Sequence, residues 1–522
     1  MNAEARFRTP GFAEMATGSA SGRQPYQANR ALNSLSSLFV GSTSVGVGSA
    51  NGLPGSLQTA LRVLQVTTVD DTGGAAKVAR NLFEAYRARG HQSWMAVGLK
   101  RAVDPDIFAI SNASGARGWG RFWWRLHDSM RLYSGSRAAR AAHAAATIAS
   151  PGKIISELRG LEDFNFPGTR RLLRLVPEQP DILHMHNLHG GYFDLRALQP
   201  LSRAVPVIAT LHDPWMFTGH CGYFLDCNRW QHGCGSCPYP DVYPAVRRDN
   251  TDRNWLRKKR IYKNSSLFVA APSQWLLERA QMSILSEAIL GTRLIPNGVD
   301  LSIFRPAVRA SARERIGLPQ DERILLFSGY SPGTSSFKDL PTLRAAAVIL
   351  GNSVTDRITL VVLGGTGEPQ REGRASVRFV GYETDEAKVA AFYQAADVYV
   401  HAARVGAENH SLSVLEALAC GVPVVATDVG GLPEQVKSLR PSSGSARRSQ
   451  PEAATGILTP PGDPRALAEA VAFLIKDSSL LRALSSNAAQ DARRRFDLQA
   501  QVDAYLDWYG EIIERRLQHS TG

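Results

Sequence analysis

The feature that most constrains the fold is a repeated alternation of short apolar runs with amphipathic helical stretches. The apolar runs have the length and composition of buried β-strands, and they fall at 61–69, 93–99, 181–186, 206–212, 267–273, 324–329, 358–365, 377–382, 397–403 and 423–429. Helical patterns separate most of them, for example at 340–350, 385–396 and 411–420. Such alternation is typical of parallel sheets covered by helices on both faces, so we predict an α/β fold.

The length of the chain and its punctuation predict two domains. A chain of 522 residues is too long for a single core. The strand-like runs form two clusters, and Pro296, Asn297 and Gly298 between them are residue types of a turn or hinge. We therefore expect one Rossmann-like domain over 59–295 and a second over 296–495.

Both ends of the chain extend beyond these domains. Residues 1–58 are rich in Ser, Gly, Ala and Asn and lack periodicity, so we expect a disordered extension. Residues 496–522 are expected to form a C-terminal helix that crosses back to the first domain. The apolar side of this helix carries Val502, Leu506, Tyr509, Ile512 and Ile513.

Composition limits the cellular setting and the class of partner. The net charge of +13 and the isoelectric point near 9.7 suit three kinds of partner: nucleic acid, an anionic membrane surface or acidic small molecules. No apolar run is long enough to cross a bilayer, and the N-terminus lacks the apolar core of a secretory signal. We therefore expect a cytoplasmic protein, whose five cysteines are thiols or metal ligands rather than disulfides.

The most informative stretch for chemistry is 401–436, which reads as strand, loop, helix, strand and Gly-Gly loop. It holds two carboxylates in the spacing E-x₇-E, with Glu408 in the loop and Glu416 in the helix. Carboxylates in these places can accept hydrogen bonds from sugar and ribose hydroxyls. Backbone N–H groups at the start of the helix favour a phosphate. These N–H groups belong to Asn409, His410, Ser411 and Leu412.

An isolated E-x₇-E would more often be a pair of solvated charges, but other motifs surround this one. Glu416 opens the run E-A-L-A-C-G-V-P-V-V, and G-G-L-P-E follows at 430–434. Gly73-Gly74-Ala75 follows the first strand, and the runs A-P-S and I-P-N-G-V-D close the first domain. Together these motifs resemble the signature of the GT4 family of retaining glycosyltransferases, over roughly residues 61 to 495. The resemblance implies the GT-B fold, in which two Rossmann-like domains face each other across a cleft.

The resemblance also implies a role for each matching residue. Glu416 is expected to hold the nucleotide ribose, and Glu408 to contact the donor sugar at the reacting centre. Gly73 and Gly74 are expected to let the backbone approach the donor phosphate or the acceptor, because no Cβ intervenes. His212, at the end of a predicted strand, matches a histidine that lies beside the transferred sugar. The alternative interpretation of His212 is a satisfied histidine at a strand end.

One position departs from the family pattern. Many relatives bind the diphosphate with an arginine and a lysine after the first strand of the second domain. Lys338 aligns with the lysine, but Tyr330 stands where the arginine is usual. Lys338 must then supply much of the charge that stabilises the leaving diphosphate, or another cation takes part.

The reaction class implied by the resemblance is transfer of a hexose from a UDP- or GDP-sugar to a saccharide or lipid-linked saccharide acceptor, with retention at the anomeric carbon. Polysaccharide biosynthesis is the expected setting. Asp70-Asp71 is not the spaced D-x-D of metal-dependent transferases, so we expect no catalytic metal or other cofactor. Two alternatives remain: a nucleotide-sugar epimerase of the same fold, against which the G-G-L-P-E run argues, and a zinc-bearing nucleic-acid-binding protein.

Four cysteines cluster shortly after His212, in the spacing C-x₅-C-x₆-C-x₂-C. They are Cys221, Cys227, Cys234 and Cys237. Four thiolates suit tetrahedral Zn²⁺, so we expect a structural zinc. An iron–sulfur cluster has the same ligand set, and two disulfides or free buried thiols are the other interpretations. The run around the cysteines also resembles a GT4 subgroup of exopolysaccharide clusters, in which it would shape the acceptor side of the cleft.

Positive charge concentrates in two stretches of the first half of the chain. Residues 117–140 hold six arginines with interleaved Trp and Phe, and 247–263 hold eight Lys or Arg against two Asp. An amphipathic helix rich in Trp and Arg suits a peripheral contact at the inner face of a membrane, whereas a packed helix with a solvated basic face is the alternative. We find no helix-turn-helix or RNA-recognition aromatic motif and expect no nucleic-acid partner.

Overall fold

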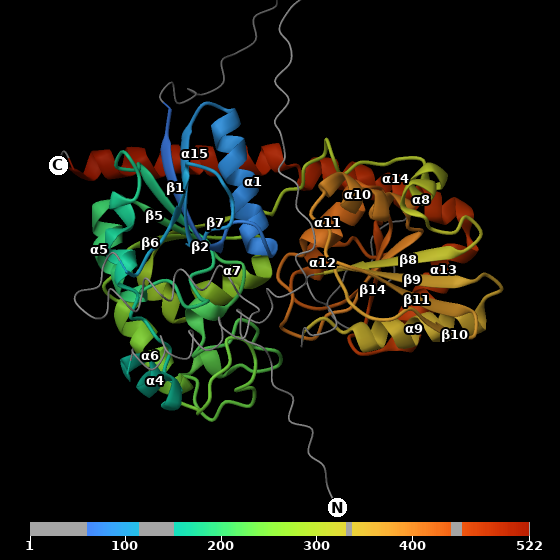
Figure 1. Cartoon of the computed structure of the whole chain (residues 1–522), viewed down its shortest axis with the longest axis horizontal. Coiled ribbons are helices and arrows are strands. Elements are labelled where there is room, and N and C mark those ends of the chain that lie inside the picture. Colours follow the sequence, from blue (N-terminus) through green and yellow to red (C-terminus); the bar gives the residue numbers. More distant parts are fainter. Residues whose placement is uncertain (1–59, 114–150, 330–336, 440–451, 521–522) are drawn as a thin grey trace, which may run out of the picture.

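The computed structural model describes residues 60–113, 151–329, 337–439 and 452–520, and within these ranges the chain builds two seven-stranded sheets (Figure 1). Helices lie against each sheet as the alternation predicts, and the α/β fold is confirmed. The extension expected at 1–58 and the basic stretch at 117–140 lie outside the described residues. Among the helices that are described, none combines the length and the apolarity needed to cross a bilayer.

The first sheet is parallel in its described strands, in the order β3-β2-β1-β4-β5-β6-β7. Its strands are β1 (Arg62–Val69), β2 (Gln92–Leu99), β3 (Ile107–Ala109), β4 (Ile182–Met185), β5 (Val207–Thr210), β6 (Leu267–Ala271) and β7 (Ile289–Leu294). The α-helices of this half are α1 (Gly74–Ala88), α4 (Pro151–Leu158), α5 (Leu198–Ala204), α6 (Thr251–Tyr262) and α7 (Gln274–Gln281). The helical spacing after the first strand is confirmed, because Val78, Leu82 and Tyr86 of α1 are fully buried.

The second sheet has the order β10-β11-β9-β8-β12-β13-β14, and only β10 runs antiparallel to its neighbour among the described strands. Its strands are β8 (Arg323–Ser328), β9 (Ile358–Leu363), β10 (Gln370–Glu372), β11 (Ala375–Val380), β12 (Val398–His401), β13 (Val424–Thr427) and β14 (Gly456–Thr459). Its helices are α8 (Arg309–Ile316), α9 (Leu340–Ser353), α10 (Glu386–Ala395), α11 (Leu412–Ala419), α12 (Leu432–Gln435), α13 (Pro464–Lys476) and α14 (Ser478–Arg495).

Each sheet has a point at which the strand order reverses. In the first sheet the chain moves outward from β1 to β3 and then returns to place β4 on the other side of β1. In the second sheet β12 returns to the other side of β8 in the same way. Ligands of open α/β sheets bind beyond the carboxyl ends of the strands at such switch points, so the topology directs attention to the ends of β1, β4, β8 and β12.

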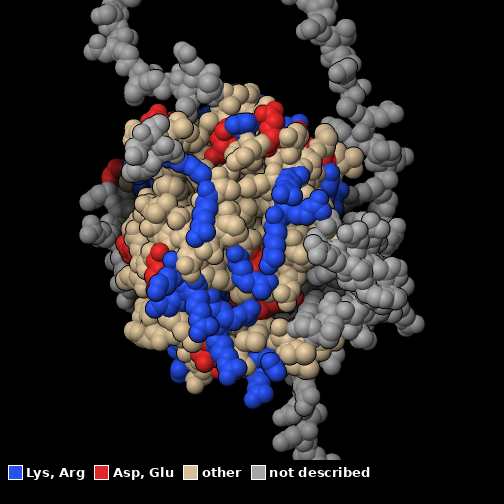
Figure 2. Space-filling view, turned by 90° about the vertical axis from the view of Figure 1, so that its left-hand side faces the viewer, with Lys and Arg blue, Asp and Glu red and all other residues tan. Residues whose placement is uncertain are grey.

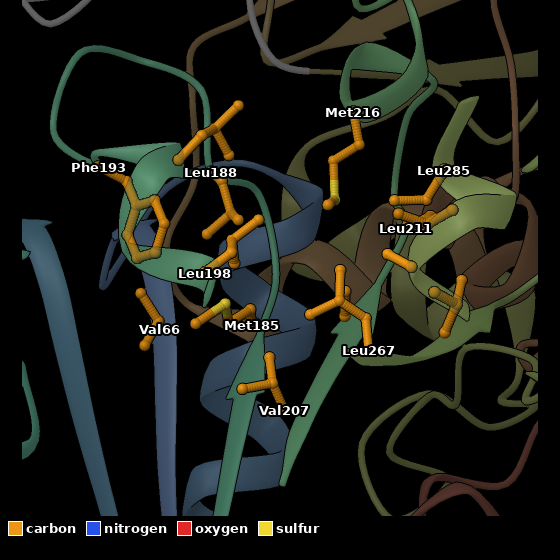
Figure 3. Packing of buried hydrophobic residues seen from close by; sticks show 14 of the residues in the cluster. Val66, Met185, Leu188, Phe193, Leu198, Val207, Leu211, Met216, Leu267 and Leu285 are labelled. Carbon is orange, nitrogen blue, oxygen red and sulfur yellow. The ribbon is translucent and has the colours of Figure 1, made fainter. Parts of the chain in front are cut away.

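The core of the first domain forms where alternate strand residues meet the helices on one face of the sheet. Val66, Met185, Val207 and Leu267 come from four neighbouring strands and belong to the same buried cluster as Leu198 of α5 (Figure 3). All five are at most 1% exposed. Burying side chains of this size stabilises the fold by about 1.5–3 kcal/mol each, which gives the strand ends a rigid base.

Two segments connect the domains, and they run beside each other. Val299 N–H donates to Phe496 O at 2.8 Å, and Leu498 N–H donates to Val299 O at 3.1 Å. Gly298 lies so close to this crossing that a Cβ there would stand 2.5 Å from Leu498 Cα. The glycine of the predicted hinge is therefore required by close packing of the two connections.

The last helix, α15 (Leu498–Ser520), starts at this crossing and extends over the first domain (Figure 1). Val502, Tyr509 and Ile512 on its expected apolar side are at most 2% exposed. They pack against residues of β1 and α1, including Val63 and Leu82. Polar contacts accompany this packing, since the hydroxyls of Tyr86 and Tyr509 lie 3.0 Å apart.

Candidate active site

Glu408 lies in the loop between β12 and α11, at the switch point of the second sheet. Its Oε2 accepts a hydrogen bond from His401 Nε2 at 3.0 Å and lies 3.9 Å from Lys338 Nζ. Burial alone would raise the pKa of Glu408, but Lys338 and His401 bring it below its ordinary value. The carboxylate is thus held ionised in a site where its side chain is only 14% exposed.

Lys338 reaches this site past the end of β8. A Cβ on Gly329 would stand 3.0–3.3 Å from the Cδ, Cε and Nζ atoms of Lys338, so the glycine makes room for the lysine stem. Tyr330, which replaces the arginine usual in the family, lies outside the described residues. Lys338 is the cation that the described structure places next to Glu408.

Glu416 lies within α11 and is nearly buried. Its Oε1 accepts from Lys77 Nζ at 2.8 Å, and its Oε2 accepts from the Tyr393 hydroxyl at 2.7 Å. Lys77 Nζ also lies 2.8 Å from Glu386 Oε1. Burial would lower the pKa of Lys77, but Glu416 and Glu386 raise it above its ordinary value. Lys77 belongs to α1, so a lysine of the first domain is bound by two carboxylates of the second.

A small pocket adjoins this ion pair. Its lining comes from both domains and includes Lys77, Asn81, Phe304, Glu386 and Glu416. The Lys77 ammonium lies 5.0 Å from the centre of the Phe304 ring, within range of a cation–π contact. The carboxylate expected to hold the ribose therefore borders open space rather than solid core.

The residues between the two carboxylates connect the domains. Asn409 Nδ2 donates to Leu211 O at 3.3 Å and to His212 O at 3.2 Å. Asn409 Oδ1 accepts from the Ser273 hydroxyl. These bonds hold the loop of the second domain directly against the end of β5.

At the start of α11, one backbone N–H group already has a hydrogen-bond acceptor within the protein. Ser411 N–H donates to Gln435 Oε1 at 2.8 Å, so this amide is occupied in the structure. His410 packs its ring edgewise on Phe496, and burial lowers its pKa to about 3. Of the four residues whose amides were expected to meet a phosphate, Ser411 thus already donates to a side chain of the protein.

The glycine pair of the first domain lies opposite the start of α11. Gly73 has φ +91°, a conformation that L side chains rarely adopt. Among the described residues beyond its chain neighbours, no atom lies within 4 Å of the position that its Cβ would take. A Cβ on Gly74 would meet Leu412 Cδ1 at 3.9 Å. The glycine loop therefore leaves the space before α1 open and faces the helix that carries Glu416.

His212 follows β5 and lies partly exposed beside Asn409. Its Nε2 lies 2.9 Å from Nδ1 of His186, the residue that follows β4. Burial lowers the pKa of His212 to about 4, so its imidazole is neutral near neutral pH. Glu408 and Lys338 lie together, and Asn409, which follows Glu408, bonds to the backbone of His212. His186, beside His212, and His401, beside Glu408, were missed by the sequence reasoning. His186 ends the predicted strand 181–186, and His401 lies near the end of the predicted strand 397–403, which was the available signal.

Glu434, the carboxylate of the G-G-L-P-E run, makes a further contact between the two domains. The two carboxylate oxygens of Glu434 accept from Gln274 N–H and Trp275 N–H, each at 2.7 Å. These amides begin α7, whose first turn is also capped by the Ser273 hydroxyl at 3.2 Å from Leu276 N. A negative charge at a helix N-terminus is favourable, so Glu434 joins the second domain to a helix of the first.

The four cysteines line one small cavity in the first domain. His220 shares this cavity, with its Nε2 3.4 Å from Cys237 Sγ. Burial raises the pKa of Cys221 and of Cys234 to about 12. As the side chains of the described residues lie, no three Cys, His, Asp or Glu converge closely enough to hold a metal ion.

The cysteine segment also reaches the second domain. The ring of Tyr223 stacks on Phe337 with centroids 4.2 Å apart, directly beside Lys338. Gly406 lies so close to this segment that a Cβ there would stand 2.0 Å from Leu225 O. The segment therefore forms one wall of the space between the domains, near Glu408.

Two family models match successive parts of the chain. The model for Glycosyltransferase Family 4 matches residues 72–303, and the model for glycosyl transferases group 1 matches residues 308–491. The first match covers the first sheet from the end of β1, and the second covers most of the second domain.

Curated relatives share part of this length. A D-inositol 3-phosphate glycosyltransferase of Thermobispora bispora is 34% identical over 234 residues, which are 42% of this chain and 50% of the relative. The putative colanic acid biosynthesis glycosyl transferase WcaC of Escherichia coli strain K12 is 28% identical over 261 residues, 48% of this chain and 60% of the relative. The chain therefore matches less than two thirds of either protein.

Solved structures resemble the chain over most of its length. Sucrose-phosphate synthase from Thermosynechococcus elongatus gives a TM-score of 0.54 at 20% identity, covering 87% of this chain and 99% of that one. WaaG, a glycosyltransferase involved in lipopolysaccharide biosynthesis, gives 0.52 at 16% identity, covering 86% and 99%. Anabaena HepE in complex with UDP and glucose gives 0.50 at 16% identity, with the same coverage. At these identities the likeness shows the fold, in which two α/β domains face each other.

Proposed function

This chain belongs to the GT4 glycosyltransferases and has the GT-B fold, and from that premise we propose that it moves a hexose from a nucleotide-diphosphate sugar to a saccharide or lipid-linked saccharide, with retention at the anomeric carbon. The observation that carries the proposal is the hydrogen bond from Asn409 to the backbone of His212. It joins the loop of the second domain that carries Glu408 to the backbone of His212 in the first domain, which supports a shared substrate site. The WcaC relative supports a setting in polysaccharide biosynthesis.

The donor is proposed to lie along the second domain. Glu416 accepts hydrogen bonds from the ribose hydroxyls, because its carboxylate borders the cavity between the domains. Lys338 and the open backbone at Gly73 and Gly74 face the diphosphate. The complex of HepE with UDP and glucose favours UDP-glucose as the first donor to test.

The chemical step is proposed to depend on charge stabilisation. The bond between the anomeric carbon and the diphosphate oxygen breaks, an acceptor oxygen bonds to the same face, and the acceptor proton passes to the departing phosphate. Lys338 stabilises the negative charge that develops on this leaving group. Glu408, held ionised by Lys338 and His401, stabilises the positive charge that develops on the sugar ring.

The acceptor is proposed to enter beside the cysteine segment, because Tyr223 and Leu225 of this segment meet the second domain next to Lys338. A lipid-linked acceptor fits the surface charge of the first domain. Figure 2 shows Lys and Arg side chains gathered over the end of the molecule that carries α5 and α6 in Figure 1. Arg253, Arg260 and Lys263 are exposed in this region, and a basic face attracts an anionic leaflet.

A structural zinc in the cysteine cavity is a separate proposal. Its first support is that Cys221, Cys227, Cys234 and Cys237 line one cavity. Its second is that residues 233–236 all have positive φ, so Cys234 and Cys237 lie on a tight turn. Metal analysis of the purified protein tests it. One zinc per chain in the wild type, lost in Cys234→Ser, supports the site. If the purified wild type contains no metal and Cys234→Ser is equally stable, the proposal is overturned.

The activity is tested by incubating the purified protein with UDP-glucose, UDP-galactose or GDP-mannose, with and without a lipid-linked saccharide extract. Release of nucleotide that requires the extract, and an α-linked product from an α-linked donor, support the proposal. Interconversion of the donor sugar without any acceptor would identify an epimerase. Binding of nucleic acid that weakens steeply with salt and has the same affinity in Glu416→Ala would identify a nucleic-acid-binding protein.

A further inference from the structure

His212 is held by a second histidine rather than by a carboxylate. His186 Nδ1 lies 2.9 Å from His212 Nε2, and His186 Nε2 lies 3.0 Å from Gln65 Oε1. Gln65 comes from β1 and His186 follows β4, the two strands at the switch point of the first sheet. Gln65 is fully buried and His186 is 2% exposed, whereas His212 at the end of the series is partly open. The series therefore leads from the core to the cleft.

The orientation of the Gln65 amide in this structure determines where the protons of the series lie. Its Oε1 faces His186 Nε2 and can only accept, so in this orientation His186 Nε2 carries the proton of that bond. Burial and the neighbouring histidines lower the pKa of His186 well below its ordinary value, so the ring is neutral and its Nδ1 is an acceptor. His212 must then donate from Nε2, which leaves its own Nδ1 without a proton.

We propose that His186 is a positioning residue for His212: it fixes the ring and the tautomer in which His212 Nδ1 accepts a hydrogen bond from a sugar hydroxyl. The inference rests on the proposed contact of His212 with the transferred sugar. An unprotonated ring nitrogen attracts a hydroxyl and repels a carboxylate. The arrangement therefore favours a neutral hexose over a uronic acid as the group transferred.

A neighbouring histidine shows what a purely structural role looks like in the same sheet. Both ring nitrogens of His184 are used inside the protein, Nε2 with the Thr210 hydroxyl at 2.7 Å and Nδ1 with the Tyr509 hydroxyl at 2.7 Å. No atom of His184 is accessible. His186 differs because its second partner, His212, is itself partly exposed beside the donor loop.

Two substitutions of His186 form a matched pair. The amide oxygen of asparagine lies near the place of Nδ1, so His186→Asn keeps an acceptor for His212 and loses the bond to Gln65. The amide of glutamine lies near the place of Nε2, so His186→Gln keeps Gln65 and loses His212. Both variants remove the imidazole from the same buried site, which controls for a general loss of packing.

The test measures kcat and the donor KM by nucleotide release for the wild type, both His186 variants, His212→Ala and the double variant His186→Gln/His212→Ala. We expect His186→Gln to lower kcat on the order of 10–100-fold with the donor KM unchanged, because misplacing a group at the reacting centre costs about this much. His186→Asn should stay within a few-fold of wild type. The kcat of the double variant should be no lower than that of His212→Ala alone, because both substitutions remove the same contact of His212 with the sugar.

Several outcomes overturn the inference and remain distinct from failure of the function. Equal losses in His186→Asn and His186→Gln, or additive losses in the double variant, show a merely structural His186. Full activity of His212→Ala removes the contact on which the inference rests while leaving the transferase in place. No transfer by the wild type with any donor overturns the proposed function itself.

Nitrogen NMR of the wild-type protein with labelled histidine gives a second readout that does not depend on the folding of a variant. A protonated Nε2 and an unprotonated Nδ1 in His212, both present before substrate is added, are expected. The opposite tautomer overturns the inference.

Discussion

At the carboxyl end of the first sheet, His186 follows β4 and His212 follows β5. At the carboxyl end of the second sheet, His401 is the last residue of β12 and Glu408 follows it. The first pair is neutral, since burial lowers the pKa of both rings, and its partners lie behind it in the first domain. Glu408 is ionised, and its partners His401 and Lys338 lie beside it in the second domain. One strand edge thus presents neutral hydrogen-bonding groups, and the other presents charge.

The difference teaches how the two halves divide the work. In the proposed reaction the leaving diphosphate needs positive charge, and Lys338 at the charged edge is the group proposed to supply it. The sugar needs orientation without added charge, and the neutral imidazole of His212 is the group proposed to supply that. Glu416 is the exception, because its cationic partner Lys77 comes from the first domain. The pair therefore also holds the two edges together.

The largest expected effect comes from removing the cation of the charged edge. Lys338→Met should lower kcat on the order of 10²–10³-fold, the usual cost of removing one group that stabilises a developing negative charge. Lys338→Arg, which keeps the charge, is the control and should lose less. Steady-state nucleotide release measures both, and equal activity of Lys338→Met and wild type would place the diphosphate elsewhere.

Acid should weaken the neutral edge. Burial lowers the pKa of His212 from 6.5 to about 4, so the unfolded chain takes up this proton more readily than the folded one. The free energy of unfolding should have its full value above about pH 6.5 and fall as the pH drops toward 4. Each buried histidine with a lowered pKa contributes a fall of up to about 1.4 kcal/mol per pH unit. Urea unfolding at several pH values checks this, and His212→Asn should flatten the dependence. An unchanged slope in the variant would contradict it.

Much of this comparison could be predicted from the sequence, but unevenly. The alternation of apolar runs predicts most strands and both domains, because buried parallel strands are short and apolar throughout. β7 was missed because it is a half-exposed edge strand of mixed composition, ILGTRL. β14 (Gly456–Thr459) was missed as well.

Glu408 and Glu416 belong to one motif that is local in the sequence and Lys338 to another, so all three could be named in advance. The neutral edge could be named only through His212. Its partners Gln65 and His186 are 121 positions apart, and no pattern within one segment reports a pairing across strands. Lys77 and Glu416, 339 positions apart, were missed as a pair for the same reason.

A substitution in α15 should weaken the packing of the first domain next to the neutral edge. Tyr509→Phe removes the hydroxyl that meets His184 Nδ1 and Tyr86, leaving a buried acceptor unpaired. We expect a loss of about 1–3 kcal/mol in the free energy of unfolding, with kcat unchanged. Chemical denaturation and the nucleotide-release assay measure the two quantities. A kcat loss at wild-type stability would mean that α15 acts on His212 as well.

The smallest expected effect concerns the link between the edges. Glu434→Ala removes the cap that joins the second domain to α7. Caps contribute about 0.5–2 kcal/mol, so the donor KM should rise by roughly 2–30-fold while kcat changes little. Glu434→Gln keeps an acceptor and should lie between the variant and the wild type. A fall in kcat with unchanged KM would place Glu434 in the chemistry instead.

The central claim, that the second domain holds a nucleotide-sugar donor through Glu416 while the first domain orients the sugar, is tested most directly by calorimetric binding of UDP and GDP. The titrations compare the wild type, Glu416→Ala and His212→Ala. The account predicts micromolar binding of one nucleotide, weakened on the order of 10–100-fold in Glu416→Ala and unchanged in His212→Ala. No binding to the wild type, or equal binding to wild type and Glu416→Ala, would contradict it.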